Sequence, residues 1–177
     1  MQEDETLFQD AVKGLERGDF SRLDPLFISQ ESLGNRSQIV SWIAAGRFDS
    51  EPAALNEALT CACFNGRTDV AELILGLGID PSGGNGTGLN ALHWAANRGQ
   101  LEAVKLLLRH NPQLETRNMY GGTVLSATVW ASVNETKPNH PEIVEALLQA
   151  GADVSQAEYP CGDERVDSLL RQYGADA

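Results

Sequence analysis

The sequence repeats itself at intervals of 33 residues, and this period constrains the fold more than any other feature. The segment Ala91–Gly99 (ALHWAANRG) follows Ala58–Gly66 (ALTCACFNG) by 33 residues and matches it at both ends and at two positions between them. The same step continues through four dipeptides: Pro25-Leu26, Ala58-Leu59, Ala91-Leu92 and Val124-Leu125. Units that recur at such a period stack, because each buries its apolar face against its neighbours. The period therefore predicts a solenoid of similar units.

Apolar residues within each unit follow the spacing of an α-helix. One stripe is formed by Leu101, Val104, Leu107 and Leu108, and a second by Ile143, Val144, Leu147 and Leu148. A stripe of this kind covers one face of a helix and leaves the other face polar. Each stripe follows a shorter apolar segment, so the pattern predicts pairs of helices that pack side by side.

Three segments resemble the ankyrin repeat family: Asn90–Gly99, Gly122–Leu125 and Asn139–Val154, the last of which reads NHPEIVEALLQAGADV. The resemblance covers residues 51–174 well and residues 5–50 weakly. It implies an all-α ankyrin-repeat solenoid of stacked antiparallel helix pairs, with short β-hairpin or loop fingers between the pairs and a cap at each end. The resemblance also implies that His93 bonds the backbone of the adjoining hairpin, as the corresponding histidine of this family does. His140 matches a second histidine of the repeat.

The resemblance divides the chain, residues 1–177, as a single ankyrin-repeat domain. The expected parts are an irregular N-terminal cap or divergent repeat (5–50), three repeats (51–84, 85–117 and 118–155) and a C-terminal cap (156–177). The first helix is predicted from the helical spacing of Leu7, Phe8, Ala11, Val12 and Leu15. Between residues 18 and 50 two interpretations stay open, with Gly18-Asp19 starting a second helix or Asp24-Pro25-Leu26 starting a first one.

Two further boundaries follow from local residue types. Ser37–Ala45 predicts a helix that ends at Gly46, and Ser50 is expected to cap a long helix from Pro52 to Asn65. The fourth pair holds seven additional residues, around 132–138, between its two helices. This insertion is either a binding loop or a tolerated surface loop.

The glycine-rich stretch 82–88 (SGGNGTG) is assigned to a finger and not to a phosphate-binding loop. No lysine follows it, and Leu89 stands where a dinucleotide-binding loop requires its third glycine. Gly88 precedes Gly121 by one period, so the turn belongs to the repeat. Asn85 and Thr87 are expected to supply turn chemistry.

Composition excludes several function classes. The net charge is −12, and only residues 85–117, with four bases and two acids, are positive. Such a chain repels nucleic acid. No run approaches the roughly 20 apolar residues of a membrane span, so neither nucleic acid nor membrane is expected as a partner. Three cysteines and an acidic N-terminus without a signal pattern favour the cytoplasm. We expect no cofactor, no metal and no enzyme activity, because no nucleophile or metal-ligand constellation is present.

The resemblance places a binding surface on the concave face, at finger tips and at the ends of the first helices. The residues expected there are Phe64, Asn65, Leu89, Asn97, Arg98, Arg117, Met119, Tyr120 and Trp130. Phe64 and Trp130 are interpreted as exposed apolar side chains, with the alternative that they cover a seam against a neighbouring helix, while Trp94 is expected in the core.

The leading hypothesis is a non-catalytic, monomeric module that binds another protein, whether as an inhibitor, an immunity-type protein or a scaffold. The alternative is a regulatory protein that binds a small ligand or metal through the glycine loop or the three histidines, His93, His110 and His140.

Overall fold

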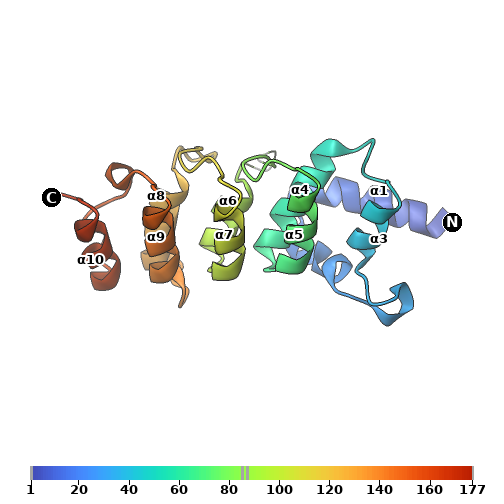
Figure 1. Cartoon of the computed structure of the whole chain (residues 1–177), viewed down its shortest axis with the longest axis horizontal. Helices are drawn as coiled ribbons and strands as arrows, with labels where there is room; N and C mark the ends of the chain where they lie inside the picture. The colour runs from blue at the N-terminus through green and yellow to red at the C-terminus, as the bar shows by residue number, and fades with distance from the viewer. Residues whose placement is uncertain (1, 85, 87, 177) are drawn as a thin grey trace.

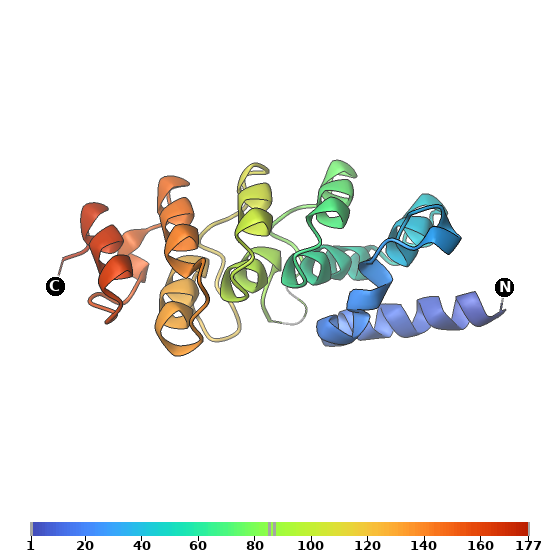
Figure 2. The ribbon, with the colours of Figure 1, turned by 90° about the horizontal axis from the view of Figure 1, so that it is seen from below.

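The helices stack side by side in a row, with two helices from each repeat. The computed structural model describes residues 2–84, 86 and 88–176. Along the row (Figure 1), the repeats are α4–α5, α6–α7 and α8–α9, and the ends are closed by α1–α3 and by α10. Figure 2 shows α4, α6 and α8 in one layer, which we call the inner helices, and α5, α7 and α9 in the other layer. Neighbouring helices of each layer pack against each other, as predicted for an all-α solenoid.

The helix bounds agree with the predicted pairs. The inner helices span α4 Pro52–Phe64, α6 Ala91–Asn97 and α8 Val124–Asn134, and the outer helices span α5 Thr68–Gly76, α7 Leu101–Leu108 and α9 His140–Gln149. The remaining elements are α1 Gln2–Arg17, α2 Phe20–Leu23, α3 Gln38–Ala44, α10 Glu164–Gln172 and the 3₁₀ turns Asp24–Phe27, Glu31–Leu33 and Val154–Gln156. None of the described helices is both long and apolar enough to cross a membrane.

Side chains at the helix starts fix where α6 and α8 begin. The Asn90 side chain accepts a hydrogen bond from His93 N (3.0 Å), and the Thr123 hydroxyl accepts one from Ser126 N (3.2 Å). Such caps satisfy backbone N–H groups that lack a partner within the helix. Gly66 and Gly99 follow α4 and α6 with φ angles of +70° and +72°, a conformation that glycine adopts without strain. The same chemistry therefore turns the chain from inner to outer helix in both repeats.

The predicted apolar stripes form the core between the two layers. Val104, Leu107, Ile143 and Leu147 are fully buried, and Leu101 and Leu108 lie half-buried at the edge. Cys61 and Cys63 of α4 are also fully buried. Burial raises the pKa of the Cys63 thiol to about 12 and moves that of Cys61 in the same direction.

The structure differs from both interpretations that the sequence left open for the segment after Gly18. Gly18 ends α1, and the very short α2 starts at Phe20 and runs directly into the 3₁₀ turn that holds Pro25. Neither interpretation describes this segment completely, because a four-residue helix is too short to be the second helix of a repeat. The described N-terminal elements contact the repeats through α4.

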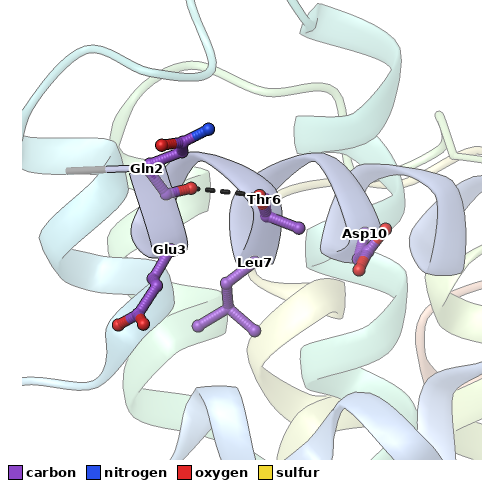
Figure 3. Close-up of a pocket in the computed structure, with 5 residues that line it drawn as sticks. All are labelled: Gln2, Glu3, Thr6, Leu7 and Asp10. Carbon is purple, nitrogen blue, oxygen red and sulfur yellow. Dashed lines mark hydrogen bonds between the residues drawn. The ribbon is translucent and has the colours of Figure 1, made fainter.

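Leu7 corrects the prediction for the buried face of α1. Phe8, Ala11, Val12 and Leu15 are buried as expected, whereas Leu7 is exposed. Figure 3 shows Leu7 beside a shallow hollow, with Thr6 donating a hydrogen bond to the Gln2 carbonyl (3.0 Å). Leu7 also lines a second hollow with Leu23 and Leu26, so α2 and the 3₁₀ turn after it cover this side chain only in part. The buried stripe of α1 is therefore narrower than the sequence suggests.

The expectations for the start of α4, for the insertion in the fourth pair and for the fingers are confirmed only in part. Helix α4 is long, with 13 residues, but its cap position is Glu51 and not Ser50, and no side chain caps it. The inserted residues of the fourth pair do not all form a loop: α8 ends at Asn134, four residues beyond the equivalent of Asn97 at the end of α6. Within the described residues the fingers are loops without strands, and the isolated β-bridge joins Gln30 and Arg36. Asn85 and Thr87 lie outside the described residues.

Candidate functional site

The predicted binding residues divide into exposed and buried groups. Tyr120 is 81% exposed, Met119 64% and Trp130 51%. Arg98 and Arg117 are exposed, and Asn65 and Asn97 are half-buried. Phe64 and Leu89 are buried, so the expected exposure of Phe64 is wrong.

An aromatic cluster at the N-terminal end of the row explains the burial of Phe64. Its ring lies edge-on to those of Phe20 and Trp94, with centroids 5.6 and 5.1 Å away, and only 9% of the residue is exposed. The Phe20 backbone is held there because its carbonyl accepts a hydrogen bond from Asn65 Nδ2 (3.0 Å). The guanidinium carbon of Arg98 lies 4.6 Å from the centre of the Phe64 ring. Phe64 therefore covers a seam, and α2 occupies the first part of the inner-helix surface.

Leu89 is buried at the start of α6, where two fingers meet. Met119 N donates a hydrogen bond to the Gly88 carbonyl (2.8 Å), next to Leu89 in the chain. A Cβ added to Gly88 would lie 2.5 Å from the Met119 sulfur. The second finger is thus packed on the first, and a partner cannot reach Leu89 without separating them.

The second finger, residues 118–122, is held by several hydrogen bonds and presents two large side chains. The Asn118 side chain accepts hydrogen bonds from Tyr120 N (2.9 Å) and Gly122 N (3.0 Å). Arg117 donates to the Gly121 carbonyl and to Gln156 Oε1, both at 2.8 Å. Met119 and Tyr120 nevertheless remain exposed. We call Arg117, Met119 and Tyr120 the finger patch.

A second exposed group lies at the C-terminal ends of two neighbouring inner helices. Trp130 and Val133 are exposed on the last turns of α8, and Arg98 directly follows α6, which packs against α8. We call Arg98, Trp130 and Val133 the helix-end patch. Trp130 lies six positions after Val124, the start of α8, which is about 9 Å along the axis. The finger patch therefore lies before the start of α8, and the helix-end patch lies toward its other end.

The two buried histidines have structural bonds that match the family pattern. His93 Nδ1 lies 2.8 Å from Asn90 Oδ1, and Nε2 lies 3.3 Å from the Gly122 carbonyl. His140 Nε2 lies 3.2 Å from the Asn97 carbonyl. Burial lowers the pKa of both rings. Among the described residues, no three His, Cys, Asp or Glu side chains are grouped to hold a metal ion.

The first finger covers a residue of α4 that the sequence did not single out. This residue, Glu57, is only 4% exposed, and its Oε1 accepts a hydrogen bond from Gly86 N (2.8 Å). It lies 33 residues before Asn90 and 66 before Thr123, the two helix caps, so the repeat register could have marked it as unusual. A carboxylate at this point repels phosphate, which argues against the glycine loop as a nucleotide site.

Comparisons with known proteins agree with this architecture. A family model for three copies of the ankyrin repeat matches residues 59–158. The mouse protein "fem-1 homolog A-like" is 35% identical over 91 residues, which is 51% of this chain and 13% of that protein. The chain thus matches only a small part of that relative. With the family model covering more than half of its length, and with helix pairs and histidine bonds in the expected places, the chain belongs to the ankyrin repeat family.

Proposed function

We propose that the protein binds another protein and has no catalytic activity of its own. The observation that carries this proposal is the exposure of Tyr120, Met119 and Trp130 on the finger and inner-helix side. Aromatic residues, Met and Arg are enriched where protein interfaces are fully buried. Ankyrin repeats generally act as protein-interaction modules, which supports the same conclusion.

The proposed contact surface consists of the finger patch and the helix-end patch. Both contain an exposed arginine, Arg117 or Arg98, within a chain whose net charge is −12. A partner that fits presents a carboxylate-rich projection to these arginines from a surface that is otherwise basic, because complementary charge favours encounter and fixes register. Of the nine residues expected from the sequence, Phe64 and Leu89 are left out because they are buried, and Asn65 and Asn97 because they are half-buried.

We further propose that the whole chain acts as one monomeric domain in the cytoplasm. The helix pairs follow one another in continuous contact from α1 and α4 through α6 and α8 to α9 and α10, which supports a single unit with caps at 5–50 and 156–177. The three cysteines are unpaired, as is usual in a reducing compartment.

The test uses Trp130→Ala and Arg98→Glu in the helix-end patch. Capture from native lysate followed by mass spectrometry identifies a partner, and calorimetry with the purified partner then measures affinity. We expect each variant to weaken binding at least tenfold, about 1.4 kcal/mol or more, with a nearly unchanged melting temperature. Leu77→Ala, at an exposed apolar residue after the outer helix α5, is the matched control and should bind normally.

The opposite pattern would place the partner elsewhere. If Trp130→Ala unfolds the protein and Arg98→Glu leaves the affinity intact, the helix-end patch is part of the packing and is not a binding surface.

A further inference from the structure

A hollow of about 250 Å³ lies between α1, α4 and the first finger. Its lining residues come from all three: Glu16, Ala53, Asn56, Glu57, Gly84 and Gly86. Figure 2 shows the loop between α5 and α6 beside the C-terminal end of α1, on the side of the inner helices. The hollow is thus separate from the finger patch and the helix-end patch but faces the same side of the molecule.

The finger backbone forms a close wall of this hollow. Thr60 donates a hydrogen bond to the Gly84 carbonyl (3.1 Å), and a Cβ added to Gly84 would lie only 2.5 Å from the Thr60 hydroxyl oxygen and 2.8 Å from the Asn56 carbonyl oxygen. Glycine at this position lets the loop rest directly on α4. The hollow is therefore a feature of the packing between finger and helix.

Glu57 lines the hollow, and its carboxyl group is buried, with one of the two oxygens unused. One oxygen accepts the Gly86 N–H bond, while Oε2 has no hydrogen-bond partner among residues 2–84, 86 and 88–176. Burial raises the pKa of this carboxyl to about 7, and the Gly86 bond opposes part of that rise. A buried acceptor without a partner is unfavourable, because it loses its hydration without a replacement. A ligand that donates a hydrogen bond and carries positive charge would remove this cost.

The charged side chains that line the hollow have one sign. Glu16 of α1 is the other charged side chain that lines the hollow, the described part of the finger contributes backbone, and the nearest titratable neighbour on α4 is the buried Cys61. Two carboxyl groups with amide and carbonyl oxygens repel anions and attract a compact cation with several N–H donors. A lysine ammonium or an arginine guanidinium has this chemistry.

We propose that this hollow is a cation subsite of the partner-binding surface, in which Glu57 receives the ammonium or guanidinium group of a basic side chain of the partner. Glu16 adds negative charge at the same site. The subsite rests on the proposed function and specifies its partner further. Such a partner places a basic side chain in the hollow and acidic groups at Arg98, so its surface spans the inner-helix side. No covalent step is involved.

The test is a titration of the isolated protein followed by NMR, with N-acetyl-lysine methylamide and N-acetyl-arginine methylamide as probes. We expect both to give saturable shifts of the Gly86 amide and the Glu57 side-chain carboxyl, while the uncharged N-acetyl-norleucine methylamide gives none. Affinity should rise several-fold from pH 6 to pH 8, because the carboxyl group ionises over this range. The stronger of the two charged probes identifies the preferred head group.

Glu57→Gln keeps the size of the side chain and removes its charge, so it should weaken probe binding at least tenfold. Glu72→Gln, on the exposed side of α5, removes the same charge far from the hollow and should change nothing. The proposal is overturned if neither charged probe shifts the Gly86 and Glu57 signals of the wild-type protein, or if the Glu57 and Glu72 variants bind alike. These results do not depend on the Trp130 experiment, so the subsite and the protein-binding function can fail separately.

Discussion

At the scale of single residues, Leu107 shows how much one buried side chain contributes. It is fully buried on α7 between the two helix layers. Leu107→Ala should lower the free energy of unfolding by roughly 2 to 5 kcal/mol, through lost transfer free energy and the remaining cavity. Urea denaturation measures this change. Leu77→Ala removes the same atoms from an exposed site and should alter stability by less than about 0.5 kcal/mol; equal losses in both variants would contradict the assignment of the core.

The sequence could predict single residues where the repeat itself defines their role. The bond of His93 to the next finger follows from the resemblance to the ankyrin repeat, and the burial of Leu107 follows from its helical stripe. Phe64 could not be placed, because its burial depends on Phe20, which is 44 positions away and outside the regular repeats. Glu57 was missed because nothing in its local sequence indicates that the finger covers it.

At the scale of helices, Arg47 joins α1 to the end of α3. Its guanidinium forms ion pairs with Asp4 and Glu5 and lies 4.2 Å from the centre of the Phe8 ring. The Asp4 carboxylate also accepts a hydrogen bond from Trp42 Nε1 (3.0 Å). The start of α1 is thus held at one point by ion pairs and by the guanidinium group over the Phe8 ring.

Arg47→Ala should therefore loosen α1 without unfolding the repeats. We expect faster amide hydrogen exchange in residues 3–12, unchanged exchange in α7, and a stability loss of about 1 to 3 kcal/mol. Lys13→Ala is the control, since the Lys13–Asp10 pair is exposed and such pairs contribute little. Equal exchange rates in α1 of both variants would show that the aromatic contacts alone hold this helix.

Element boundaries were predictable where one residue type sets them and not where several compete. Gly66 and Gly99 mark the ends of regular inner helices, and the structure agrees. Ser50 was a reasonable cap by type, but the chain starts α4 after Glu51 instead. The inserted residues after Trp130 continue α8 because its sequence, ASVN, remains compatible with helix, a choice that spacing alone does not reveal.

At the scale of the whole molecule, the 33-residue period predicted the row of helix pairs because each unit contacts mainly its neighbours. The same local rule could not place α1 and α2, which lack the period. Their packing onto α4 removes Phe64 from the surface, so the binding surface begins one repeat later than the register implies.

The two buried thiols of α4 allow the opening of this helix to be measured by chemical labelling. A thiolate attacks a disulfide reagent and releases the reagent's other half as a thiol. Cys61 and Cys63 lie inside the helix that contacts α1, α5 and α6. Cys161 is half-buried, and burial raises the pKa of its thiol only to about 11. At pH 8 we expect one thiol to react early and the other two to react together at the rate at which α4 becomes exposed, read by absorbance and mass spectrometry. Three equal rates would mean that α4 opens as readily as the C-terminal end.

With the expected pattern, the lifetime of the closed state of α4 could be measured without any engineered label. A bound partner that lengthens this lifetime would be detected by the slower labelling alone.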